Sequence, residues 1–91
     1  MSEDTALSSI EQIRGEIDSL DVQLVKLLNE RASKSLEIRN LKPEARMGLF
    51  DPKREEEIFE KVADLNEGPL YSDDICAIYA TILKVSKEMH G

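Results

Sequence analysis

Residues 7–41 limit the fold of this chain more than any other segment, because they contain no proline and a single glycine, Gly15. Apolar residues recur within them at steps of three and four, which is the period of an amphipathic helix. These residues are Leu7, Ile10, Ile13, Ile17, Leu20, Leu24, Leu27, Leu28, Ile38 and Leu41. The pattern predicts one long helix that Ser8 or Ser9 caps and that ends before Pro43.

Such a helix is too long for one copy of the chain to cover. At about 1.5 Å per residue it spans about 48 Å, which exceeds the width of a compact domain of 91 residues. A core built from so few residues is also only marginally stable unless another chain contributes to it. The long helix therefore predicts that the chain forms oligomers.

Two shorter helices follow. Asp51 is the predicted N-cap of the second helix, Pro52 takes its first position, and a turn at residues 66–69 ends it. Ser72 opens the third helix. The predicted apolar faces comprise Ile58, Phe59, Val62 and Leu65 in the second helix and Ile75, Ile78, Tyr79, Ile82, Val85 and Met89 in the third. With no strand pattern, the prediction is an all-α single domain over residues 1–91, with one long, one short and one medium helix.

Composition excludes several classes of function. Twelve Lys and Arg against 19 Asp and Glu give a formal net charge of -7, which disfavours binding to nucleic acid or to an anionic membrane. Cys76 and His90 are the only residues of their kinds, so the chain lacks the ligands of a zinc site and we expect no metal. The sequence has neither a signal-peptide pattern nor about 18 consecutive apolar residues that could span a membrane. We therefore expect a cytoplasmic protein.

Three cations of the long helix have a spacing that predicts a binding site. Arg31 and Lys42 are eleven residues apart, close to a whole number of helical turns, so they share one face with backbones about 16 Å apart. Two long side chains leaning toward each other could hold opposite ends of a small dianion. Arg14 lies seventeen residues before Arg31 on a different face, and reaches the same ligand only from another subunit. Taken alone, such cations more often belong to a solvated surface.

These cations stand within a wider pattern of motifs. The segments IRGEIDSLD at 13–21, LLNERA at 27–32 and DPKREE at 51–56, together with Lys42, resemble the all-helical class of chorismate mutases. The segment LNEGPL at 65–70 is similar to the mutase domain of bifunctional chorismate mutase–prephenate dehydratases. The order and separation of the motifs carry this resemblance, which covers nearly the whole chain.

The resemblance implies a fold, an assembly and a reaction. The chain is expected to form an intertwined homodimer of three-helix chains, in which each active site takes Arg14 of the partner subunit. The expected reaction is the unimolecular rearrangement of chorismate to prephenate in phenylalanine and tyrosine biosynthesis, with no cofactor. The site must hold a flexible dicarboxylate in its reactive shape and stabilise charge on its ether oxygen. A fusion to, or a partnership with, another enzyme of the aromatic pathway also fits the resemblance.

The resemblance also assigns roles to four cations. Arg14 of the partner subunit, Arg31 and Arg54 match carboxylate-binding positions, where a guanidinium fork suits a carboxylate. Lys42 matches the donor to the ether oxygen, so we expect it to be the residue most costly to lose. The cations Lys34, Lys53 and Arg39 have no such match and are expected to be solvated, while Cys76 is expected to be a small buried residue.

Four further residues complete the expected site. Asp51 and Glu55 match contacts to the substrate hydroxyl, although without the resemblance they are an N-cap and a first-turn acid. Ser86 matches a contact to a substrate carboxylate, and otherwise is an interface residue. His90 stands where the family usually has Gln, or Glu in some branches, as second donor to the ether oxygen. Because an imidazole donates with added charge when protonated, we expect activity to rise on mild acidification, unless the usual donor lies in a longer chain.

Two rival functions and one plainer interpretation stay open. The first rival is an isochorismate pyruvate lyase, an enzyme of similar fold that holds a similar dianion. Residues 51–55 fit the mutase pattern better. A noncatalytic regulatory relative is kept open by His90. A simple helical dimerisation module fits the periodicity but gives no reason for Arg31, Lys42 and Arg54 to occur in this arrangement.

Overall fold

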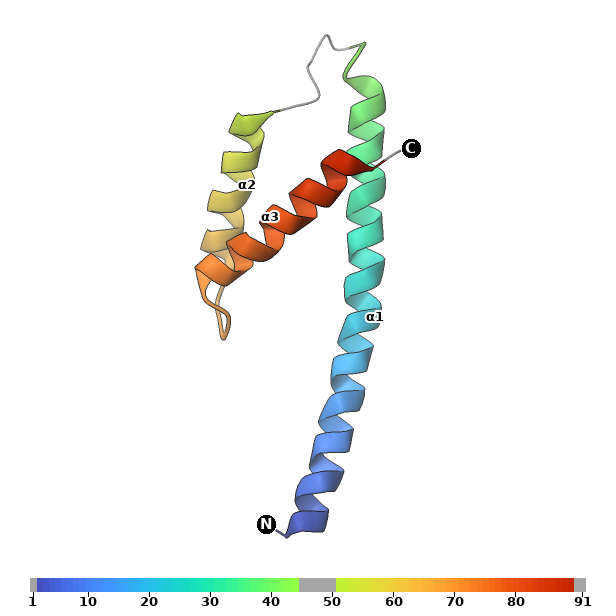
Figure 1. The fold of residues 1–91 in the computed structure, drawn as a ribbon, viewed down its shortest axis with the longest axis vertical. Coiled ribbons are helices and arrows are strands. Elements are labelled where there is room, and N and C mark those ends of the chain that lie inside the picture. Colours follow the sequence, from blue (N-terminus) through green and yellow to red (C-terminus); the bar gives the residue numbers. More distant parts are fainter. Residues whose placement is uncertain (1, 45–50, 90–91) are drawn as a thin grey trace. The chain divides into compact units, whose positions relative to one another are not determined.

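The computed structural model describes residues 2–44 and 51–89. These residues form no strand and three helices (Figure 1), namely α1 (Glu3–Leu41), α2 (Pro52–Leu65) and α3 (Ser72–Glu88). The predicted all-α fold with one long, one short and one medium helix is therefore confirmed. Within the described residues, no helix is both long enough and apolar enough to span a membrane.

The first of two compact units, Met1–Lys34, consists mainly of α1. Ser2 caps this helix, because its Oγ accepts a hydrogen bond from the backbone N–H of Thr5 at 3.2 Å. Two acidic residues in the first turn complement the positive end of the helix dipole. The prediction that Ser8 or Ser9 caps the helix is wrong, since the acidic segment before them is itself helical.

The first unit leaves its apolar stripe uncovered. No residue of α1, which the structure describes from end to end, is buried. The exposed fractions of its large apolar side chains within Met1–Lys34 run from 44% to 71%. On the stripe these side chains are Leu7, Ile10, Ile13, Ile17, Leu20, Leu24, Leu27 and Leu28, whereas Val22 and Val25 lie outside it. Contiguous apolar surface of this extent is typical of a protein–protein interface.

The second unit, Ser35–Gly91, contains the end of α1 together with α2 and α3. Its core comprises Ile58, Val62 and Leu83, each no more than 9% exposed. Four partly buried side chains pack against this core, namely Phe59, Ile75, Cys76 and Tyr79. This packing joins α2 to α3, so the start of α2 lies within reach of a long side chain from the end of α3.

The buried faces of α2 and α3 differ from the prediction at four positions. Leu65, Ile78 and Val85 are predicted core residues, yet they are 67%, 48% and 55% exposed. Leu83 is buried, although the periodicity does not place it on the predicted apolar face of the third helix. The face of α3 that meets α2 passes from Tyr79 to Leu83 at a step of four, and this leaves the other predicted positions on its flanks.

Local signals determine where the two shorter helices begin. Asp51 is the N-cap of α2 and Pro52 takes the first helical position, as predicted. The third helix starts at Ser72, also as predicted, but its N-cap is Tyr71, which makes no side-chain cap hydrogen bond. The start of α2 is thus the better defined of the two, and it carries several of the predicted site residues.

Candidate active site

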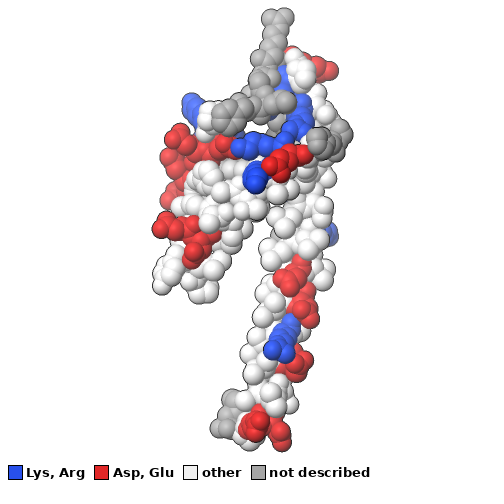
Figure 2. Space-filling model, in the orientation of Figure 1, with Lys and Arg blue, Asp and Glu red and all other residues white. Residues whose placement is uncertain are grey.

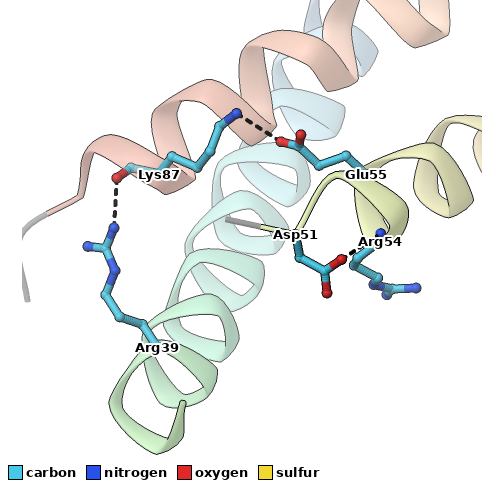
Figure 3. Close-up of polar contacts among 5 residues, drawn as sticks. All are labelled: Arg39, Asp51, Arg54, Glu55 and Lys87. Carbon is cyan, nitrogen blue, oxygen red and sulfur yellow. Dashed lines mark hydrogen bonds and ion pairs between the residues drawn. The ribbon is translucent and has the colours of Figure 1, made fainter. Parts of the chain in front are cut away.

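The start of α2 carries three predicted site residues, Asp51, Arg54 and Glu55. The Asp51 carboxylate accepts a hydrogen bond from the backbone N–H of Arg54 at 3.0 Å (Figure 3), so the side chain acts as the cap. The Arg54 side chain is 60% exposed, and its Nη1 lies 3.6 Å from Oε2 of Glu57. Glu55 points the other way, toward α3 (Figure 3). This turn therefore presents a cation and a carboxylate in different directions.

The Glu55 carboxylate forms an ion pair across the two helices. Its Oε1 lies 2.9 Å from Nζ of Lys87, in the last turn of α3. The Glu55 side chain is 24% exposed and that of Lys87 is 49% exposed, so the pair is partly shielded from water. Sequence reasoning missed Lys87, although a cation in the last turn of a helix, one residue after Ser86, was a visible signal.

Arg39, in the last turn of α1, binds the end of α3. One guanidinium nitrogen donates to the backbone carbonyl of Lys87 at 2.7 Å (Figure 3). A second guanidinium nitrogen donates to the backbone carbonyl of Met89. The prediction that Arg39 is solvated is wrong. The last carbonyls of a helix lack partners within the helix, and they carry the negative end of its dipole, so a guanidinium is well suited to them.

Ser86 and Lys42 are both half-buried in the second unit. Ser86 directly precedes Lys87, so it lies in the turn of α3 that Arg39 and Glu55 both bind. Lys42 follows the last residue of α1, and its backbone N–H still donates to the carbonyl of Ile38 at 3.0 Å. Its backbone therefore continues the last turn of that helix.

Figure 2 shows how charge is distributed on the second unit. On the face that it shows, Lys and Arg side chains gather toward the end where α2 begins and α3 finishes, whereas Asp and Glu side chains predominate along the rest of α2. Two of the predicted cations, Lys42 and Arg54, belong to this unit, although the whole chain carries a net charge of -7.

The first unit carries the remaining two predicted cations. The Arg14 side chain is 69% exposed, and its Nη1 lies 3.1 Å from Oε1 of Glu11, one helical turn away. Arg31 is half-buried. The last predicted site residue, His90, lies outside the described residues. Across 2–44 and 51–89 no group of three His, Cys, Asp or Glu residues could hold a metal ion.

The family of the chain follows from comparison with known proteins. Residues 13–91 match the family model described as chorismate mutase type II. The chain belongs to this family. The resemblance expected from the sequence motifs is therefore confirmed, and the matched residues include every candidate site residue from Arg14 to His90.

Relatives of this chain include longer proteins. The bifunctional chorismate mutase/prephenate dehydratase of Aquifex aeolicus (strain VF5) is 39% identical over 61 residues, which are 67% of this chain and 17% of that protein. The protein of the same description from Neisseria gonorrhoeae is 31% identical over 70 residues, 77% of this chain and 19% of that protein. The chain thus spans about a fifth of the length of these curated relatives.

Two solved structures share the fold along most of the chain. The structure of chorismate mutase (form II) from Thermus thermophilus matches with a TM-score of 0.86 at 32% identity, over 89% of this chain and 92% of that one. The form I structure from the same organism matches with a TM-score of 0.83 at 33% identity, over 86% of this chain and 98% of that one. The fold of this chain is therefore that of chorismate mutases.

Proposed function

We propose that this chain is a chorismate mutase, which rearranges chorismate to prephenate in the biosynthesis of phenylalanine and tyrosine. The observation that carries the proposal is the family match over residues 13–91, because it extends through all the motifs and site residues quoted above. The two Thermus proteins of similar fold are also named chorismate mutases, which supports the same activity.

The reaction depends on position and charge rather than on a nucleophile. A C–O bond of chorismate breaks while a C–C bond forms within the same molecule, so no group passes to the protein. The barrier falls when the flexible dianion is held in its reactive shape, and when charge that develops on the ether oxygen meets fixed donors. Side chains of this chain supply both effects, and we propose no cofactor.

The cations bind the two carboxylates and the ether oxygen. Arg31, Arg54 and Arg14 of the partner subunit bind the carboxylates through their guanidinium forks. Lys42 donates to the ether oxygen, whose negative charge grows in the transition state. Its position directly after α1 supports this role, because a continuing helical backbone limits the directions in which the side chain can extend.

The other site residues orient the substrate. Glu55 contacts the substrate hydroxyl, and Asp51 contacts it through the backbone. The cap hydrogen bond of the Asp51 carboxylate supports a backbone role, because that bond already uses the side chain. Ser86 contacts a substrate carboxylate, and His90 is the second donor to the ether oxygen.

The active enzyme is an intertwined homodimer in which the long helices pair. Two features of the first unit support this: the exposed apolar stripe of α1 and the exposed side chain of Arg14. A second copy that covers the stripe removes apolar surface from water, and also brings Arg14 of the partner subunit to a site that the single chain leaves incomplete. Residues 1–91 form one domain of this dimer.

The chain works in the cytoplasm, beside an enzyme that consumes prephenate. The names of the bifunctional relatives join a mutase to a prephenate dehydratase, which supports a fusion or a partnership of this kind.

The experiment that tests the function is the conversion of chorismate by the purified protein, followed by loss of chorismate absorbance and by chromatographic identification of the product. Prephenate as the sole product is expected. Isochorismate is tested in parallel. If the protein releases pyruvate from isochorismate and forms no prephenate from chorismate, the lyase function is indicated instead. A folded dimer that binds chorismate but does not convert it would indicate a noncatalytic relative.

A further inference from the structure

Three helix ends are linked through one residue, Lys87. Its backbone carbonyl accepts a hydrogen bond from Arg39 of α1 at 2.7 Å, and its ammonium lies 2.9 Å from the Glu55 carboxylate of α2 (Figure 3). All three residues belong to the second unit. Lys87 is therefore fixed at both its backbone and its side chain, by groups from two different helices.

Arg39 binds the backbone at the point where α3 ends. The C-cap residue Met89 is extended, with φ -63° and ψ 141°, so the helical turn does not continue through it. The carbonyls of Lys87 and Met89 both accept hydrogen bonds from the Arg39 guanidinium. A planar fork that binds two carbonyls fixes the orientation of this turn more closely than a single donor would.

The residues that this arrangement orders are proposed substrate contacts. Ser86 precedes Lys87 in the chain, so the turn that Arg39 holds also carries Ser86. Glu55 has several rotamers available on the surface of a helix, and the contact with Lys87 selects one of them. The pair is partly shielded, with Glu55 24% exposed, which makes the contact stronger than one in bulk water.

We propose that Arg39 and Lys87 are positioning residues for substrate binding, which hold Ser86 and the Glu55 carboxylate in their binding geometry. Lys87 acts on Glu55 directly, and Arg39 acts through the last turn of α3. This inference rests on the proposed chorismate mutase function. It adds two residues, from α1 and α3, that the family resemblance did not assign.

The test of Lys87 is a comparison of Lys87→Gln with Lys84→Gln, which makes the same change on the exposed surface of the same helix. Because Glu55 contacts substrate both before and during the reaction, we expect Lys87→Gln to raise KM about three- to tenfold and to change kcat less than about twofold. Lys84→Gln should change neither. The variant Lys87→Arg, which keeps the charge, should restore most of the affinity.

The variant Glu55→Gln separates positioning from general stability. In that background, Lys87→Gln should cause almost no further rise in KM, because the carboxylate that Lys87 holds is gone. A rise of the same size in both backgrounds would overturn the proposal, since Lys87 would then act independently of Glu55. Equal KM values for Lys87→Gln, Lys84→Gln and wild type would overturn it too.

The test of Arg39 uses Arg39→Lys and Arg39→Gln, with hydrogen exchange of the last turn of α3 measured beside the kinetics. We expect Arg39→Gln to speed exchange in residues 85–88 and to raise KM about tenfold, with Arg39→Lys between it and wild type. Faster exchange with an unchanged KM would show a purely structural cap and overturn the positioning role. If the wild-type protein forms no prephenate, the proposed function fails, whereas normal wild-type turnover with unaffected variants defeats only this inference.

Discussion

A single charge on the apolar stripe of α1 should weaken the proposed dimer strongly. Leu20 is 56% exposed in the single chain. Full burial of a leucine contributes about 1.5–3 kcal/mol, so covering the part that remains exposed contributes about 0.8–1.7 kcal/mol per chain. A two-fold dimer contains the residue twice, so Leu20→Asp removes about 2–3 kcal/mol, a rise in Kd of about 30- to 150-fold. Desolvation of the new carboxylates adds to that loss.

The matched control for this prediction is Val22→Asp. Val22 is 71% exposed and lies two residues further along α1, about 200° around the helix from Leu20. This change should alter Kd by no more than about two- to threefold. Sedimentation velocity over a concentration series measures both Kd values. Equal effects of the two substitutions, or a monomeric wild-type protein, would show that this stripe is not the dimer interface.

Three further predictions concern the site and the core. Lys42→Ala should lower kcat about 10²- to 10³-fold while Lys26→Ala, an exposed lysine of α1, leaves it unchanged; similar rates for both would remove Lys42 from the reaction. Turnover should rise from about pH 8 to about pH 5 as His90 gains a proton, and His90→Gln should flatten that rise; an identical profile in both proteins would exclude His90 as a donor. Leu83→Ala should lower the free energy of unfolding in urea by about 2–3 kcal/mol, and a loss below about 0.5 kcal/mol would contradict its place in the core.

The sequence predicts the helices well because their signals are local. The period of the apolar residues and the Asp51–Pro52 start depend only on residues within a few positions of one another, and both are confirmed. The first helix begins at Glu3 rather than near Leu7, because the acidic segment before the stripe is itself compatible with a helix and Ser2 is available to cap it.

Contacts between distant segments are harder to predict from sequence. The burial of Leu83 depends on how α3 is rotated against α2, and periodicity leaves that rotation open by about one residue. Arg39 and Met89 are fifty positions apart, so no local pattern connects them. The same is true of Glu55 and Lys87, which meet only because α2 packs against α3.

The candidate site residues have no local sequence signal of their own. The expected roles of Arg31, Lys42 and Glu55 came from the family resemblance, since a helix surface offers many charged residues that look alike by spacing alone. The family match covers all of them, whereas their individual roles stay predictions. The structure adds the ion pair of Glu55 with Lys87 and the hydrogen bonds of Arg39 at the end of α3, on which the proposed positioning roles rest.

In the proposed enzyme, two copies of this chain share each site in which chorismate rearranges. The most direct measurement mixes two inactive variants, Arg14→Ala and Arg31→Ala, lets their subunits exchange, and follows the formation of prephenate. Half of the dimers are then mixed, and each mixed dimer has one site with both arginines, so we expect recovery to about a quarter of wild-type activity. Full exchange of subunits without any recovery would contradict the shared site.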